Sequence, residues 1–124
     1  MGDSLEKPTA ALDLLPENEP SPLRADVLRW LGTTLRELGR TTQAESHYEE
    51  SRALAEAIRY GLGEAHALNC LAIVAQRRGD MESARDKYRR AARQANNAGD
   101  YRLAGMVGQN LGVLANIQGI WTGR

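Results

Sequence analysis

Two stretches of the chain decide its fold, because they match each other at a fixed offset. Residues 25–48 read ADVLRWLGTTLRELGRTTQAESHY, and residues 65–88 read AHALNCLAIVAQRRGDMESARDKY. A shift of 40 residues aligns Gly39 with Gly79, Ala44 with Ala84, Tyr48 with Tyr88, and Leu31-Gly32 with Leu71-Ala72 and Leu111-Gly112. Coincidence does not keep one offset at so many chemically distinctive positions, so the chain is an array of repeats.

Each repeat has the pattern of two helices and no strand. Apolar residues recur at the three- and four-residue spacing of a helical face, as at Leu28, Leu31 and Leu35. We expect helices over residues 9–15, 24–38, 42–60, 63–78, 81–97 and 101–118. The class is therefore predicted to be all-α.

Glycines and capping residues mark the expected helix ends. Gly39, Gly79 and Gly119 stand where a helix C-terminus favours a residue that tolerates positive φ, and Gly61 with Gly63 marks a further break. Two start signals follow the turns: Thr42 with Glu45 has the spacing of a capping box, and Asp80 is placed to cap the next helix.

Composition excludes several classes of protein. The 124 residues suit one domain, and the 16 basic and 16 acidic residues leave no net charge to attract nucleic acid or an anionic membrane. With Cys70 alone, neither an intrachain disulfide nor a multi-cysteine zinc site is expected. No apolar run is long enough to cross a membrane and no export leader is evident, so we expect a cytoplasmic protein without nucleic-acid or membrane partners.

These repeats resemble the tetratricopeptide repeat, whose unit is a helix pair, helix A and helix B. The Leu-Gly or Leu-Ala pair and the turn glycine belong to helix A, and the alanine and tyrosine belong to helix B. The resemblance implies an α-α superhelix, a solenoid of stacked antiparallel helix hairpins. The 40-residue period exceeds the family's usual 34 and overlaps HEAT and armadillo repeats, but those lack this Leu-Gly, Gly, Ala and Tyr spacing.

The resemblance also implies a division of the chain. Residues 1–22 form a partial N-terminal repeat, the remnant of a helix B, followed by a Pro-rich connector. Residues 23–61 form the first full unit and residues 62–100 the second. Residues 101–124 correspond to helix A of a third, incomplete unit.

Catalysis finds no support in these residues, and we expect neither an enzyme nor a cofactor or metal site. His47 and His66 lie on different predicted helices without metal-ligand spacing. Cys70 lies between two leucines and is interpreted as a small packing residue.

Binding is the expected role, since helix A faces line a concave groove in the family that the chain resembles. The resemblance places on that groove Arg29, Thr33, Arg36, His66, Asn69, Gln76, Arg77, Gln109, Asn110 and Asn116. Amide and guanidinium groups suit the backbone and carboxylates of a peptide. We expect Arg29, Asn69 and Asn110 to project into solvent. The clamp that holds chaperone tails is not expected, because Cys70 and Met106 occupy two of its positions.

Three functions follow from this interpretation. The first is a scaffold or interaction module that binds a protein or peptide in the groove. The second is a peptide- or ligand-sensing segment of a larger bacterial signalling or transcriptional regulator, and the third is a self-assembly module. We also expect a homo-oligomer such as a dimer, formed at an uncapped C-terminal end through Leu114, Ile117, Ile120 and Trp121.

Overall fold

The computed structural model describes residues 3–15 and 19–122, and within them not the side chains at 3–5, 118 and 120–122. Every regular element in this described part is a helix. The six helices are α1 (Asp3–Leu14), α2 (Pro22–Glu37), α3 (Thr41–Ala57), α4 (Gly61–Arg77), α5 (Met81–Asn97) and α6 (Tyr101–Thr122). The predicted all-α class is confirmed.

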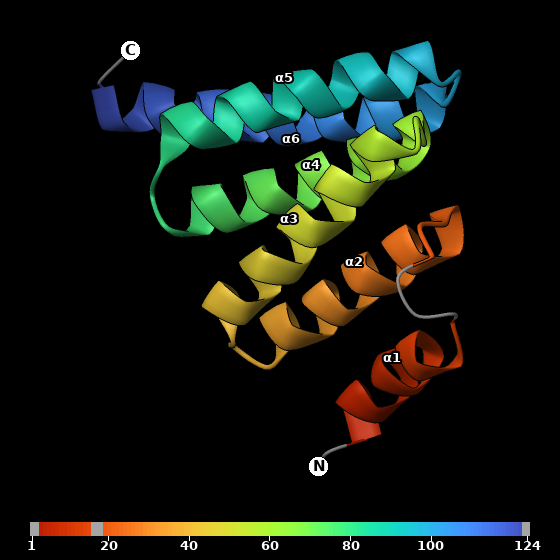
Figure 1. The fold of residues 1–124 in the computed structure, drawn as a ribbon. Helices are drawn as coiled ribbons and strands as arrows, with labels where there is room; N and C mark the ends of the chain where they lie inside the picture. The colour runs from red at the N-terminus through yellow and green to blue at the C-terminus, as the bar shows by residue number, and fades with distance from the viewer. Residues whose placement is uncertain (1–2, 16–18, 123–124) are drawn as a thin grey trace.

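Consecutive helices pack against each other along the whole chain (Figure 1). Only α2 and α4 add a substantial contact between helices that are not consecutive. Each helix therefore contacts mainly the helices before and after it in sequence, which is the organisation of a helical solenoid. The predicted arrangement of stacked antiparallel hairpins is confirmed.

Four helix connections share one hydrogen-bonding pattern. In the first, the Gly39 N–H donates to the Arg36 carbonyl at 3.0 Å and the Arg40 N–H donates to the Leu35 carbonyl at 2.8 Å. This pair of hydrogen bonds is the Schellman motif, which needs a positive φ at the residue after the helix. The equivalent residues are Gly39, Arg59, Gly79 and Gly99, with φ of 80°, 58°, 82° and 79°.

The break predicted at Gly61 and Gly63 is therefore misplaced. The turn comes at Arg59, and both glycines lie inside α4. Gly119 was expected to end the last helix, but α6 continues through it to Thr122, and Gly119 is not among the positive-φ residues. A glycine permits a helix end without enforcing one.

One of the two predicted start signals is correct. The Asp80 side chain accepts a hydrogen bond from the Ser83 N–H at 3.2 Å and caps α5. The capping box of Thr42 and Glu45 is wrong, because α3 begins at Thr41 and has no side-chain cap. Glu45 instead pairs across the array with Arg78 at 2.8 Å.

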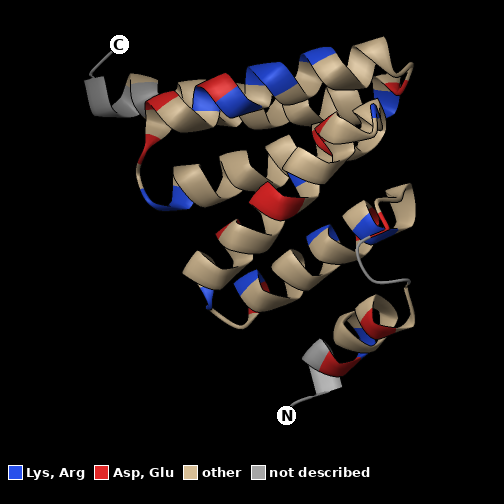
Figure 2. Ribbon diagram, in the orientation of Figure 1, with Lys and Arg blue, Asp and Glu red and all other residues tan. Residues whose placement is uncertain are grey.

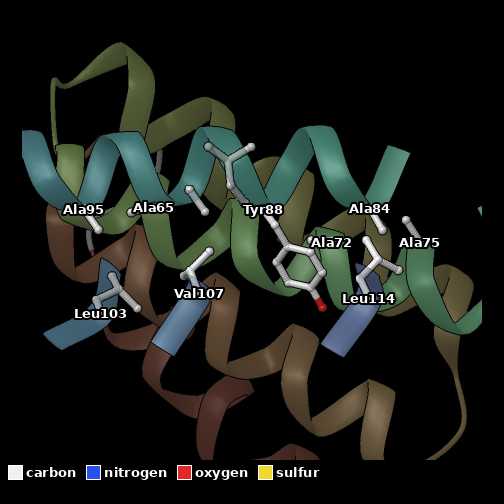
Figure 3. Close-up of a cluster of buried hydrophobic side chains, with 11 residues drawn as sticks. Ala65, Ala72, Ala75, Ala84, Tyr88, Ala95, Leu103, Val107 and Leu114 are labelled. Carbon is white, nitrogen blue, oxygen red and sulfur yellow. The ribbon is translucent and has the colours of Figure 1, made fainter. Parts of the chain in front are cut away.

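Two buried tyrosines fill the space that small residues leave between the helices. Tyr48 of α3 lies against Gly32 of α2, where an added Cβ would meet two ring carbons at 2.8 Å. Tyr88 of α5 occupies the equivalent place in the second unit, among alanines that include Ala72 (Figure 3). Small residues here allow the close helix approach that the sequence predicts.

A serine replaces alanine at one buried position of the first unit. Ser51 of α3 donates a 2.6 Å hydrogen bond to the Ala25 carbonyl of α2, and its equivalent in the second unit is the fully buried Ala91. A buried hydroxyl is tolerated when it has a partner, so the hydrogen bond accounts for the difference between the units.

The two outer helices are covered to different extents. Helix α1 packs on α2, where Pro8 is buried and Leu12 joins the cluster around Leu31 and Leu35. Helix α6 packs on α5 through one side only. Charged residues follow α5 along its length (Figure 2), whereas Arg102 is the sole charged residue of α6.

Candidate binding groove

Helices α2, α4 and α6 carry the side chains assigned to the groove, and their shared side is called the helix A face below. A hollow on it has a volume of about 580 Å³. His66 of α4 lies on one side of this hollow, and Asp100 and the first half of α6, including Gly105, Met106 and Gln109, lie on the other. The structure thus brings His66 and Gln109, two of the predicted groove residues, to one place.

His66 is half-buried at this hollow, which affects its charge. Burial lowers the pKa of His66 below its ordinary value, and the positive charge of Arg29 lowers it further. Asp100 and Asp26 act in the opposite direction with smaller weight. The imidazole is therefore mainly neutral near pH 7, and it offers one hydrogen-bond donor and one acceptor.

Asn69 does not project into solvent as expected. Only 6% of the residue is exposed, and its side-chain oxygen accepts a 3.2 Å hydrogen bond from the Asn110 amide. Asn110 of α6 lies 41 residues after Asn69 in sequence. The periodicity within α4 therefore could not predict that Asn69 is buried. Asn69 ties α4 to α6, and Asn110 remains the partly exposed member of the pair.

Two more groove residues are engaged by the core tyrosines. Thr33 shares a 2.8 Å hydrogen bond with the Tyr48 hydroxyl, and Gln76 accepts one of 2.8 Å from the Tyr88 hydroxyl. Burial, followed by the influence of Cys70, raises the pKa of Tyr48 to about 12. The two hydroxyls therefore stay protonated and hold Thr33 and Gln76 in place, while the Gln76 amide group keeps two donors for a ligand.

Arg29 and Arg36 lie two turns apart on α2 and are partly buried. The Arg29 guanidinium lies 3.5 Å from the Asp26 carboxylate, and the Arg36 guanidinium lies 6.0 Å from the centre of the Tyr48 ring. Burial raises the pKa of the Cys70 thiol, whereas Arg29 and Arg36 both lower it. Cys70 packs against the core as expected.

Tyr60 and Asp26 form a pair that the sequence did not predict, and Asp26 in turn pairs with Arg29. The Tyr60 hydroxyl donates to both carboxylate oxygens of Asp26, at 3.0 and 3.1 Å. Burial and Asp26 raise the pKa of Tyr60. Asp26 lies on α2 and Tyr60, 34 positions later, lies just before α4, so no local pattern could have connected them.

The remaining groove residues are exposed. Arg77, Gln109 and Asn116 all lie open on α4 or α6. Of these, only Gln109 lines the 580 Å³ hollow.

The residues predicted for self-association fare differently. Leu114 is only 1% exposed and packs in the core with Tyr88, because α5 covers that side of α6, so its assignment to an open surface is wrong. Ile117 is half-buried, and the side chains of Ile120 and Trp121 lie outside the described residues. Among the described side chains of α6, the exposed large apolar residues are instead Tyr101, Met106 and Val113.

Two kinds of feature are absent from residues 3–15 and 19–122. No helix among them combines the length and apolar character needed to cross a membrane. In the same part of the chain, no group of three or more His, Cys, Asp or Glu residues is arranged to hold a metal ion.

Comparison with known proteins gives one match. No curated protein and no solved structure matches the chain. Residues 23–97 match the model of the tetratricopeptide repeat family, and this segment covers α2, except its first residue, and all of α3, α4 and α5. The chain therefore belongs to the tetratricopeptide repeat family.

Proposed function

We propose that this protein is an interaction module that holds a peptide or partner segment on the helix A face of α2, α4 and α6. Tetratricopeptide repeats generally mediate protein–protein interactions and are typically not enzymes. The observation that carries the proposal is the 580 Å³ hollow between α4 and α6, where His66 and Gln109 lie beside apolar Met106. Apolar lining with a few polar groups is the usual composition of a binding site.

Neighbouring side chains extend this surface across three helices. Asn110 lies next in sequence to Gln109 and is partly exposed, and Arg29 of α2 is close enough to His66 for its charge to lower the pKa of the imidazole. The amides supply donors and acceptors for a peptide backbone, and the arginine supplies charged donors. The proposed groove therefore combines backbone recognition with a preference among side chains.

A displayed library of random peptides tests this proposal. Peptides selected on the immobilised chain are synthesised, labelled and titrated against the wild type and Gly105→Trp by fluorescence anisotropy. Gly105 lines the hollow, and an added Cβ there meets nothing within 4 Å, so the large side chain fills the hollow without a clash in the core. Gly105→Trp should weaken the selected peptides at least tenfold, which corresponds to about 1.4 kcal/mol.

Gly108→Trp is the matched control for that measurement. Gly108 lies one turn further along α6, has equally open surroundings and does not line the hollow. Peptide affinity should therefore survive in Gly108→Trp. The groove would be refuted if the library yielded no binding peptide, or if neither substitution changed the affinity of the selected peptides.

Self-association is a second candidate, favoured by the composition of α6. From Leu103 to Thr122 the helix carries no charged residue, yet Met106 and Val113 are exposed. Uncharged, partly apolar surface of this kind is typical of an interface. Sedimentation velocity over a concentration series should show a dimer that Val113→Glu dissociates. A wild-type chain that stays monomeric at every concentration would exclude this candidate.

A further inference from the structure

Two arginines of the helix A face keep buried nitrogens without hydrogen-bond partners. These atoms are Nε of Arg29 and Nη1 of Arg36. A buried donor on a charged group is costly to leave unpaired, because it has lost water and gained nothing in exchange. The two residues are seven positions apart, so they lie on the same side of α2, about 10.5 Å apart along its axis.

The groups around these nitrogens do not neutralise both charges. Asp26 pairs with Arg29 at 3.5 Å, and its carboxylate already accepts two hydrogen bonds from the Tyr60 hydroxyl. The Arg36 guanidinium lies over the face of the Tyr48 ring, which carries no net charge. Arg77, exposed at the end of α4, adds a third positive charge to the same helix A face. This part of the surface therefore has an excess of positive charge.

We propose that the partner segment is acidic, with two side-chain carboxylates that pair with Arg29 and Arg36. This inference rests on the groove proposed above and specifies what the groove selects. A carboxylate accepts short, charge-assisted hydrogen bonds from the accessible nitrogens of a guanidinium, and its negative charge offsets the positive charge that the buried nitrogens leave without a partner.

The spacing of the two arginines indicates the geometry of the segment. In a polyproline II conformation, residues three apart lie on one side of the chain and about 9 Å apart. Two acidic residues with two residues between them therefore match the separation of Arg29 and Arg36. Nucleic acid fits less well, since the Tyr48 and Tyr88 rings are buried and unavailable for stacking on bases.

Defined peptides test the inference directly. The probe is a fluorescein-labelled, C-terminally amidated nonapeptide with glutamate at every third position and proline elsewhere. Its partner in the comparison carries glutamine in place of glutamate. The glutamate peptide should bind roughly tenfold more tightly than the glutamine peptide, as expected for one or two hydrogen bonds to charged groups.

Substitutions assign the effect to the two arginines. Arg29→Gln and Arg36→Gln should each weaken the glutamate peptide by roughly fivefold to tenfold, with little change for the glutamine peptide. Arg90→Gln is the matched control, because it removes the same charge from an exposed site on α5, where Arg90 forms a long ion pair with Asp86 at 3.9 Å. Circular dichroism melting of each variant verifies that the fold is intact.

The outcomes separate this inference from the proposed groove. Equal binding of the glutamate and glutamine peptides, with loss of both in Gly105→Trp, would overturn the acidic preference and leave the groove standing. Binding of neither peptide, while selected library peptides still depend on Gly105, would have the same meaning.

Two further arms test the source of the negative charge. Tighter binding of a single-stranded oligonucleotide than of the glutamate peptide, lost in Arg36→Gln, would overturn the inference in favour of nucleic acid. Binding that requires a free C-terminal carboxylate in place of the glutamates would also overturn it. Loss of the glutamate preference in both arginine variants, but not in Arg90→Gln, supports it.

Discussion

Helices α4 and α6 have related sequences but different surroundings. Helix α4 is enclosed by α3 and α5, whereas the extensive packing of α6 among the described residues is on α5, with side-chain contacts to α4 such as the Asn110–Asn69 hydrogen bond. The pair Leu71-Ala72 in α4 corresponds to Leu111-Gly112 in α6. Ala72 is fully buried, whereas an added Cβ at Gly112 would meet nothing within 4 Å. The repeat pattern therefore records which positions are suited to a neighbouring helix, and the structure shows which of them have one.

The largest expected difference concerns the tyrosines. Tyr88 is buried between α4, α5 and α6, and 73% of Tyr101 is exposed on α6. Tyr88→Ala should lower the free energy of unfolding by about 4 kcal/mol through the cavity that it leaves. Tyr101→Ala should change it by less than about 0.5 kcal/mol. Urea denaturation followed by circular dichroism measures both, and similar losses in the two variants would contradict the packing described for α6.

A smaller difference in stability is expected between substitutions of two asparagines, Asn69 on α4 and Asn116 on α6. Asn69→Ala should cost about 2 kcal/mol, because it leaves a small cavity and removes the partner of the Asn110 amide. Asn116 is exposed on α6, and its replacement by alanine should be almost neutral. Thermal melting of the two variants provides the measurement. A stable Asn69→Ala chain would place Asn69 on the surface, as its sequence position first indicated.

The connections between helices offer a change of opposite sign. Arg59 adopts φ of 58°, which costs a residue with a Cβ about 1–2 kcal/mol relative to glycine. Arg59→Gly should therefore stabilise the chain by about 1 kcal/mol. Gly79→Arg, at the equivalent turn with φ of 82°, should destabilise it by a similar amount. Chemical denaturation of both variants in parallel tests the pair, and stabilisation by both would refute the equivalence of the turns.

Features repeated at 40 residues could be predicted from sequence, and features formed by distant contacts could not. Tyr48, Tyr88 and the Asp80 cap follow from spacing and local chemistry, as do most helix boundaries. The turn at Arg59 was not predicted, because an arginine does not indicate a positive φ. Gly61 and Gly63 did suggest one, so the break was placed two to four residues too late.

The sequence predicted which helices carry the candidate site, but it did not predict which side chains on them are exposed. His66 and Gln109 meet at one hollow, as the alignment of helices A implies. The burial of Asn69 and of Leu114 depends on how α6 lies against α4 and α5, and periodicity within one helix does not contain that information. The unpaired nitrogens of Arg29 and Arg36 likewise appear only once the neighbouring helices are in place.

One pair of substitutions tests most directly whether a small residue matters only where a second helix covers it. In Gly32→Ala the new methyl group would meet the Tyr48 ring at 2.8 Å and the Ala44 carbonyl oxygen at 3.2 Å, so the free energy of unfolding should fall by about 1–2 kcal/mol. In Gly112→Ala the methyl group meets nothing, and the higher helix propensity of alanine should raise it by up to about 1 kcal/mol. Urea denaturation of the two variants should therefore give shifts of opposite sign. Stabilisation by Gly32→Ala, or destabilisation by Gly112→Ala, would contradict the account.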